Sequence, residues 1–285
     1  MRWALGCLAA LAIGATPAAA VDCGDVLVGP ATYVLDADLA CATGPALTLR
    51  DQAVLRMQQH VVHLDAVTAS PAVVIEGTGV RLLDGTILSD SVTGALLDVD
   101  GMAHQIRNVR ALGHAAGDAV GIRTAPSSRR ILIARSAAEF TWDGLSPLGT
   151  AFDLAGEEHT IVRNRASRAF RGFRLDGAGH RARRNEAIGT VVGVEVHGAA
   201  HLVARTLATL GGDGIIVFGD GHRVLRNRVE SNVIGILAAG AHTLFRRNVA
   251  LGNFPDLRDD TPDCGTDVWI QNRFETAESF GDCIE

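Results

Sequence analysis

The chain contains no lysine, so all 26 of its basic residues are arginine. No lysine can therefore serve as a general base or as a nucleophile. Aromatic residues are also sparse, and Tyr33 is the only tyrosine. The formal net charge is −6. This acidic balance argues against a general nucleic-acid binder, because such proteins carry an excess of basic residues.

Apolar runs are short, and the first one is typical of an export signal. Arg2 supplies a positive end, an apolar stretch follows from Ala4 to Ile13, and Ala18 to Ala20 form a small-residue cleavage site. The alternatives are a membrane anchor and a lipoprotein signal. The apolar run is too short to span a bilayer, and no cysteine has a suitable context for lipid attachment. We expect residues 1–20 to be a signal peptide and the mature protein to be secreted or periplasmic, with no membrane span.

The mature chain, residues 21–285, loses Arg2 and no acidic residue, so its charge is 25 − 32 = −7. It keeps four cysteines in two close pairs, one near each end. An exported protein meets an oxidising compartment, where such pairs form disulfides. We predict the disulfides Cys23–Cys41 and Cys264–Cys283. The alternative, free or metal-bound thiols, lacks the C-x-x-C spacing that zinc favours.

A repeat of 21 residues is the most informative feature that is present. It places glycine at Gly172, Gly193, Gly214 and Gly235. It places asparagine at Asn164, Asn185, Asn227 and Asn248, with Thr206 in the remaining position. It places arginine at Arg163, Arg184, Arg205, Arg226 and Arg247. Such a fixed period means that each unit repeats the backbone path of the unit before it, so equivalent side chains stack in columns.

Each repeat contains three short runs in which apolar and polar residues alternate, which predicts strands with one buried face. Three strands and three turns leave no room for a helix. The expected fold is all-β, a single right-handed parallel β-helix with coils of about 21 residues. Positions one and three after each glycine should point inward, as in Phe173 and Leu175. The asparagines should hydrogen-bond between coils at a tight turn, and the glycines should supply unusual backbone angles.

Several segments resemble bacterial secreted right-handed parallel β-helix proteins of the pectate-lyase-like superfamily. They are Cys23-Gly24-Asp25, Leu39-Ala40-Cys41, the stretch from Gly79 to Ile87, and the closing stretch from Asp260 to Phe274. The resemblance covers nearly the whole mature chain and is specific for fold but weak for activity. Residues 21–60 should form an N-terminal cap and residues 252–285 a C-terminal cap. The segment from Leu55 to His60 departs from the L-D-L-N-G-H stretch that many members carry in the first coil.

In that superfamily the substrate groove follows the outside of one strand column. In this sequence, the second and fourth positions after each glycine point outward on the corresponding column. They create a polar patch, for which we predict catalytic roles: Asp153, Arg174, Asp176, Glu195 and His197. They also create an apolar surface at Ile216, Phe218 and Leu237. We predict that Arg123, Ile216 and Phe218 bind substrate.

An insertion from Glu139 to Gly149 lies next to this polar patch. Insertions in solenoids tend to gather on one face, which is often the binding face. Trp142 could stack on a sugar ring, and Asp143 could add a carboxylate. The alternative is that Trp142 packs against the coil and holds the loop down.

Three mechanisms are open for the polar patch. In hydrolysis, Asp153 and Glu195 would act two coils apart, about 9.6 Å along the axis, which is close to the separation in inverting glycosidases. In β-elimination from a uronic acid, His197 would be the base, and Arg174 or Arg123 would neutralise the carboxylate. In calcium-assisted elimination, the ligands would be Asp98, Asp100 and Asp153. The alternative to all three is that charges simply pair across strands and keep an exposed sheet soluble.

Two further columns of stacked residues, one of arginine and one of histidine, each have a functional and a structural interpretation. The arginines at 21-residue spacing could hold an acidic polysaccharide, although stacked guanidinium planes explain the column without a ligand. Histidine recurs at the same spacing at His159, His180, His201 and His222. A straight ladder does not converge on a metal ion, so we interpret these histidines as turn packing.

The leading hypothesis is a secreted or periplasmic protein that acts as a lyase or glycoside hydrolase on acidic, uronic-acid polysaccharide. We expect a monomer with no cofactor other than a possible calcium ion and no nucleic-acid partner. The alternative is a non-catalytic β-helix module that binds glycan or a protein partner at the cell envelope. A third hypothesis is a periplasmic maturation factor for a metalloenzyme.

Overall fold

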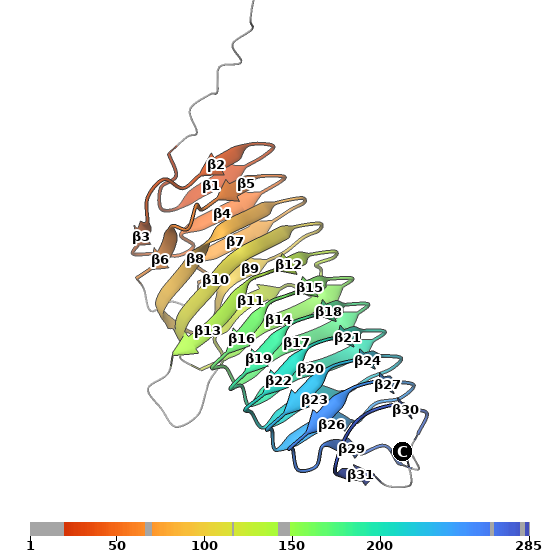
Figure 1. Ribbon diagram of the computed structural model, residues 1–285. Helices are drawn as coiled ribbons and strands as arrows, with labels where there is room; N and C mark the ends of the chain where they lie inside the picture. Colours follow the sequence, from red (N-terminus) through yellow and green to blue (C-terminus); the bar gives the residue numbers. More distant parts are fainter. Residues whose placement is uncertain are drawn as a thin grey trace, which may run out of the picture.

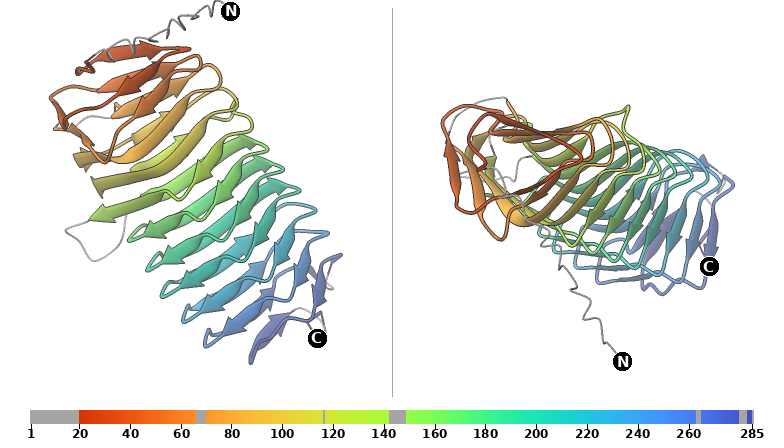
Figure 2. Two further views of the ribbon diagram at one scale, coloured as in Figure 1. Left: turned by 45° about the horizontal axis from the view of Figure 1, so that its top comes forward. Right: turned by 90° about the horizontal axis from the view of Figure 1, so that it is seen from above.

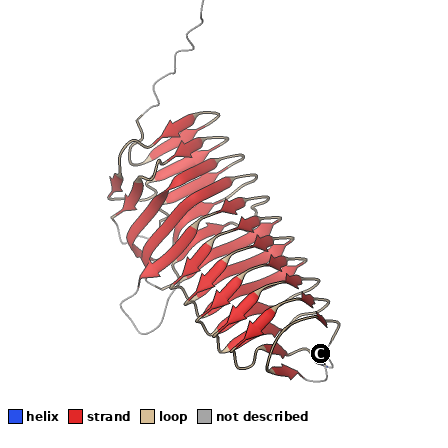
Figure 3. Ribbon diagram, in the orientation of Figure 1, coloured by secondary structure: helices blue, strands red, loops and turns tan. Residues whose placement is uncertain are grey.

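The computed structural model describes residues 20–65, 70–115, 117–141, 149–262, 265–279 and 283–284. The chain winds into a right-handed parallel β-helix whose coils stack along one axis, with the first and last coils at opposite ends (Figures 1 and 2). The described residues contain strands and loops and no helix (Figure 3). The predicted fold class is therefore confirmed.

Three strand faces run the length of the solenoid. Sheet 1 has twelve parallel strands, in this order: β1 (Asp25–Val28), β4 (Leu47–Arg50), β7 (Val73–Glu76), β9 (Ala95–Val99), β11 (Val120–Thr124), β14 (Thr150–Glu157), β17 (Arg171–Ala178), β20 (Val192–Ala199), β23 (Asp213–Val217), β26 (Ile234–Ala238), β29 (Leu257–Asp259) and β31 (Ala277–Ser279).

The strands of sheet 2 are β2 (Thr32–Val34), β5 (Val54–Arg56), β12 (Leu132–Ala134), β15 (Thr160–Val162), β18 (Arg181–Arg183), β21 (Leu202–Ala204), β24 (Arg223–Leu225), β27 (Leu244–Arg246) and β30 (Val268–Ile270). The strands of sheet 3 are β3 (Leu39–Cys41), β6 (Val61–Leu64), β13 (Ala137–Thr141), β16 (Arg165–Ser167), β19 (Glu186–Ile188), β22 (Leu207–Thr209), β25 (Arg228–Glu230) and β28 (Val249–Leu251). Two long strands, β8 (Arg81–Val92) and β10 (Gln105–Ala115), pair with both sheets.

The core lies inside the coils and consists of the inward side chains of all three sheets. The predicted inward residues after the repeat glycines are all buried: Phe173, Leu175, Val194, Val196, Ile215, Val217, Ile236 and Ala238. The rings of Phe152 and Phe173 stack at 4.7 Å between coils. Alternation of apolar and polar residues therefore predicted the buried face correctly.

The role predicted for the repeat glycines is wrong. None of the four has a φ angle in the left-handed region. A Cβ atom on Gly172 would instead lie 2.5 Å from the carbonyl oxygen of Gly193 and 3.0 Å from Cβ of Ala187. These glycines are needed because the backbone of the next coil approaches too closely for a side chain. Positive φ angles occur at the far end of the strands, as at Gly177 (+115°) and Gly198 (+97°).

The asparagine column forms the predicted ladder of hydrogen bonds between coils. Asn164 N–H donates to Oδ1 of Asn185 at 2.9 Å, and Nδ2 of Asn185 donates to the carbonyl oxygen of Ile161 at 3.0 Å. Asn227 and Asn248 repeat this arrangement. Thr206 interrupts it, and the buried Oγ1 of Thr206 has no hydrogen-bond partner.

The histidine column is a second buried ladder, as its interpretation as turn packing predicts. Its rings stack at 4.7 to 5.2 Å. Nδ1 of His180 accepts a hydrogen bond from the backbone N–H of His159, and Nε2 of His180 donates to the carbonyl oxygen of Asp176 at 2.9 Å. Burial disfavours the charged imidazolium and lowers the pKa values of His180 and His201 to about 4.

One of the two predicted disulfides lies within the described residues. Cys23 and Cys41 form the predicted disulfide, with their Cα atoms 5.6 Å apart. Cys264, the predicted partner of Cys283, lies outside the described residues, as does most of the predicted signal peptide. Within the described part of the chain, no helix has the length and apolar character needed to cross a membrane.

The insertion starts later than predicted. Residues 139–141 belong to β13, which pairs with β10, and Phe140 is fully buried. Their alternation of polar and apolar residues continues the strand, so residues 139–141 are not part of an insertion. Trp142 and Asp143 lie outside the described residues, and their predicted roles stay predictions.

Candidate functional site

A column of charged side chains runs across the outer face of sheet 1. The register of the strands places its members on successive coils in the order Asp98, Arg123, Asp153, Arg174, Glu195, Ile216, Leu237. A neighbouring column contains Asp176, His197 and Phe218. The structure thus brings all five predicted catalytic residues together on β14, β17 and β20, with Ile216 and Phe218 on the next coil.

Arg123 and Asp98 form a two-pronged ion pair at one end of this column. Nε and one terminal nitrogen of Arg123 donate to the two Asp98 oxygens at 3.1 and 2.8 Å. Asp100 accepts a hydrogen bond from the hydroxyl of Ser127 at 2.6 Å. In the part of the chain that the structure describes, no three histidine, cysteine, aspartate or glutamate side chains are grouped so as to hold a metal ion.

Arg174 lies between the carboxylates of Asp153 and Asp176 and forms a close ion pair with neither of them. Its terminal nitrogens lie 3.4 Å from Asp176 and 3.9 Å from Asp153. Burial raises the pKa of Asp153, and the charges of Arg174 and Arg123 oppose this effect only in part. The Arg174 side chain is 39% exposed, so its guanidinium can reach a ligand on the sheet surface.

Glu195 is the most enclosed carboxylate of the patch, with only 13% of its side chain exposed. One oxygen lies 2.7 Å from Nε2 of His197, and the other accepts a hydrogen bond from Nε of Arg171. Burial acts to raise the pKa of Glu195, but the hydrogen bond with His197 and the charge of Arg171 together hold it below its ordinary value. Glu195 is therefore ionised near neutral pH.

Sequence reasoning missed Arg171. It immediately precedes the repeat glycine Gly172, and its side chain reaches diagonally to the next coil, where it binds Glu195. Its place on β17, opposite Thr150 and Val192 in the strand register, follows from the repeat. The outward direction of this position was therefore available from the sequence, but the diagonal contact was not.

The patch ends on an apolar surface. The ring of His197 stacks on Phe218 with centroids 4.8 Å apart. Ile216, on the coil after Glu195, is 8% exposed. Leu237 follows it in the column and is partly exposed. Polar and apolar surfaces thus adjoin on neighbouring coils of one sheet.

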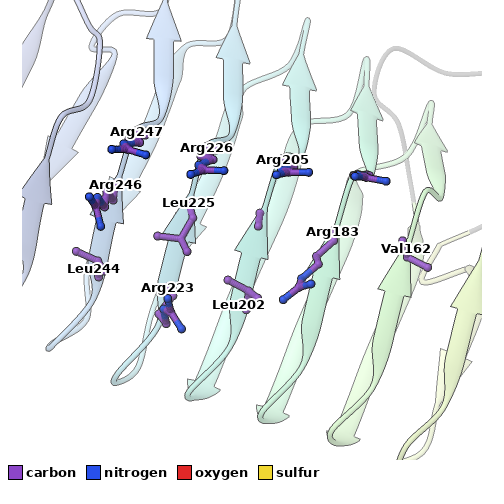
Figure 4. A pocket seen from close by; sticks show the side chains of 12 residues that line it. Val162, Arg183, Leu202, Arg205, Arg223, Leu225, Arg226, Leu244, Arg246 and Arg247 are labelled. Atoms are coloured by element: carbon purple, nitrogen blue, oxygen red, sulfur yellow. The ribbon is translucent and has the colours of Figure 1, made fainter.

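A separate groove of about 600 Å³ crosses sheet 2 and the turn that follows it (Figure 4). Its lining residues are Val162, Arg183, Arg184, Leu202, Ala204, Arg205, Arg223, Leu225, Arg226, Leu244, Arg246 and Arg247. We call it the arginine groove. It contains most of the arginine column found in the sequence, and its lining includes no acidic residue.

No family model matches the chain, and no curated protein matches it. Among solved structures, the chain is similar to a pectate lyase, with 13% identity over 93% of this chain and 73% of that one and a TM-score of 0.40. It is similar to a periplasmic alginate epimerase, with 10% identity over 89% and 78% and a TM-score of 0.42. It is also similar to the A-module of a mannuronan C-5 epimerase from Azotobacter vinelandii, with 10% identity over 90% and 85% and a TM-score of 0.32.

Proposed function

We propose that the chain acts on uronic-acid polysaccharide at the polar patch of sheet 1, by removing the proton next to the sugar carboxylate. The observation that carries this proposal is the pair formed by Glu195 and His197, 2.7 Å apart, beside the exposed guanidinium of Arg174. A base next to a cation is the arrangement that proton abstraction from a carboxylated carbon requires.

His197 is suited to be the base. An ionised carboxylate can only accept hydrogen bonds, so Glu195 accepts from Nε2–H of His197 and fixes that tautomer. Nδ1 of His197 then carries the lone pair, and within the described part of the chain it has no hydrogen-bond partner. When Nδ1 takes a proton, the carboxylate of Glu195 lies 2.7 Å from the other ring nitrogen. His197 and Glu195 thus act as base and positioning group.

Arg174 is suited to stabilise the charge that develops on the substrate. Removing the proton at C5 of a uronate pushes electrons into its carboxylate, which then carries two negative charges. A guanidinium can bind both carboxylate oxygens at once. Because its contacts with Asp153 and Asp176 are long, Arg174 can turn toward a substrate without breaking a close ion pair.

The bond changes follow from this arrangement. Nδ1 of His197 takes the C5 proton, and the electron pair of the C5–H bond moves into the carboxylate. In elimination, the electron pair then returns from the carboxylate, the C4–O bond breaks, a C4–C5 double bond forms, and the leaving oxygen takes a proton from solvent water. In epimerisation, the electron pair returns to C5, which takes a proton from solvent water on its opposite face, and the chain stays intact. The partly exposed ring of Phe218 offers contact for the C–H faces of neighbouring sugar rings, whereas Ile216, predicted to contact substrate, is buried.

A second candidate is hydrolysis by Asp153 and Glu195. The specific observation is that their environments shift their pKa values in opposite directions, with Asp153 raised and Glu195 lowered. Opposite shifts of this kind divide two carboxyl groups into an acid and a base. The two residues lie two coils apart, about 9.6 Å, which fits an inverting enzyme. In this case Arg174, between them, would bind the sugar carboxylate.

Product analysis on polygalacturonate and alginate tests both candidates. Elimination produces an unsaturated sugar that absorbs ultraviolet light, hydrolysis produces reducing ends without that absorbance, and epimerisation changes the sugar composition without shortening the chain. We expect the unsaturated or epimerised product, and its loss in His197→Gln and Arg174→Gln. Arg50→Gln, which alters an ion pair with Glu76 on the same sheet, is the matched control and should keep activity. No product from either polymer, with and without added calcium, would refute a catalytic role and favour a binding module.

We also propose that the protein works outside the cytoplasm. The disulfide between Cys23 and Cys41 supports an oxidising compartment, and the first twenty residues have the order of a signal peptide. Mass spectrometry of the exported protein tests this, since cleavage after Ala20 leaves a mature chain that begins at Val21.

A further inference from the structure

We propose that the arginine groove on sheet 2 is a second binding site, separate from the polar patch on sheet 1, for a linear acidic polysaccharide. The groove lies on another face of the solenoid from the polar patch. Its seven arginines come from the strands β18, β24 and β27 and from the turn after sheet 2: Arg183, Arg184, Arg205, Arg223, Arg226, Arg246 and Arg247.

These arginines lack the ion pairs that other arginines of the chain form. Within the described residues, none of the seven lies within 4 Å of a carboxylate, and the only side-chain partner is Gln271, which accepts from Nε of Arg247 at 2.9 Å. All seven are exposed. The adjoining hollow adds Arg181 and one carboxylate, Glu158, which already pairs with Arg130 at 3.1 Å. The groove therefore presents positive charge without local neutralisation on a protein whose net charge is −6.

The backbone does not explain why this column is arginine. In five consecutive coils, the three turns each contain positions with φ between 52° and 68°, beside the glycines with larger positive φ in the turn after sheet 1, such as Gly198 at +97°. In the turn after sheet 2 they are Arg163, Arg184, Arg205, Arg226 and Arg247, with φ between 55° and 57°. In the turn after sheet 1 they are Glu158, Gly179, Ala200, Gly221 and His242, and in the turn after sheet 3 they are Arg168, Gly189, Leu210, Ser231 and Gly252. Over these five coils the column after sheet 2 contains only arginine, whereas the other two columns accept glycine and varied residues. On the other coils the column after sheet 2 has Asp84, Asn108, Arg135 and Gln271 in the same conformation.

The column is also unfavourable without a ligand. Neighbouring coils are about 4.8 Å apart, so exposed guanidinium groups face one another at a distance where like charges repel. Glycine would relieve both this repulsion and the strain of a left-handed conformation. A bound polyanion offsets this repulsion.

The geometry fits a polysaccharide better than another polyanion. The turn column places one arginine on each coil, and a pyranose residue of an extended chain advances by about the same distance as one coil. An acidic polysaccharide with one carboxylate per sugar can therefore match the column over five coils. Figure 4 shows Arg205, Arg226 and Arg247 in one row across neighbouring coils, with Leu225 next to this row and Leu244 further along the strand, in a row with Leu202 and Arg223. These leucines offer an apolar surface to the C–H faces of the sugar rings.

Binding of oligosaccharides to the full-length mature protein tests the proposal. Oligogalacturonates and oligomannuronates of two to eight residues are titrated by calorimetry in the His197→Gln background, which stops turnover at the other site. We expect affinity to rise with length up to about five or six residues and to fall with added salt. The variant Arg205→Gln/Arg226→Gln should bind the hexamer at least tenfold more weakly. Its unfolding midpoint should not fall, because neither arginine has an ion pair to lose.

The control variant is Arg165→Gln/Arg228→Gln, which removes the same charge from exposed, ion-paired arginines on sheet 3 and should stay within twofold of the parent. Neutral cello-oligosaccharides of equal length should bind at least tenfold more weakly than the uronate hexamer. The proposal is overturned if the hexamer does not bind, or if the groove variant binds as well as the parent. It is also overturned if inorganic polyphosphate binds as tightly as the uronate, since the site would then respond to charge alone. Absence of turnover by the wild-type protein would refute the proposed function and leave this binding test unaffected.

Discussion

The buried histidine ladder makes the stability of the fold depend on pH between about 6.5 and 4. In the folded protein, Nδ1 of each ladder histidine accepts a backbone N–H, as His201 does from His180 at 3.0 Å. A protonated imidazole has no such acceptor, and burial also disfavours its charge, so the pKa values of His180 and His201 are lowered to about 4. In the unfolded chain a histidine titrates near 6.5. The unfolded state therefore binds more protons within this range, and stability falls as the pH falls.

The magnitude follows from the difference between the two pKa values. A change from 6.5 to about 4 corresponds to about 3 kcal/mol for each of His180 and His201. This contribution is fully present above pH 6.5 and is lost progressively toward pH 4. At pH 4.5 the two residues together should have lost about 5 kcal/mol, which is comparable with the whole stability of many domains. Burial also lowers the pKa values of the other two ladder residues, His159 and His222, so the ladder as a whole acts in the same direction.

Urea unfolding followed by circular dichroism at several pH values between 7.5 and 4.5 measures this loss. His201→Gln removes one titrating group, so its free energy of unfolding should depend less on pH, by about 2–3 kcal/mol over the range. His242→Gln removes an exposed imidazole outside the ladder and should change the pH dependence much less. The reasoning would be refuted if the free energy of unfolding of the wild-type protein did not change between pH 7 and 4.5. It would also be refuted if His201→Gln and His242→Gln changed the pH dependence equally.

Three further predictions concern single positions. Thr206→Asn should raise the free energy of unfolding by about 1 kcal/mol in urea titrations, because it completes the ladder and removes an unpaired buried hydroxyl; no gain would contradict the ladder's role. Gly193→Ala should lower the free energy of unfolding by about 2–4 kcal/mol, because its Cβ would lie 2.4 Å from a carbonyl oxygen of the next coil. The Cβ of Gly189→Ala would meet no atom within 4 Å, so this control should lose only about 1 kcal/mol, because of its φ of +62°. Equal losses in the two variants would show that crowding is not the reason for the glycine at position 193. Arg171→Gln should move the acidic limb of the activity–pH profile to higher pH, because Glu195 loses the cation that lowers its pKa; an unchanged limb would remove Glu195 from the reaction.

The sequence predicted the architecture because the repeat carries the necessary information. A period of 21 residues stacks equivalent positions, and alternation separates the buried residues from the outward ones. The polar patch follows from these two facts, since Arg174 and Glu195 occupy the same position in consecutive coils. The strand register and burial confirm both steps.

Other features depend on distances that a repeat does not contain. A glycine in a sequence has two common structural reasons, a left-handed φ and the close approach of another backbone. The sequence alone does not distinguish between them. This is why the role of Gly172 was predicted wrongly. The contact between Arg171 and Glu195 was missed for a similar reason, because a long side chain can cross from one column to the next. Most of the insertion lies outside the described residues, so its tryptophan remains a prediction.

A crystal structure of the His197→Gln variant soaked with a uronic-acid oligosaccharide tests the central claim most directly. The account predicts a sugar chain across β14, β17, β20 and β23, with a carboxylate bound by Arg174 and a C5 atom facing the position of the missing imidazole. An oligosaccharide bound to the arginine groove alone, with the surface of sheet 1 empty, would contradict the claim that the polar patch acts on the polymer.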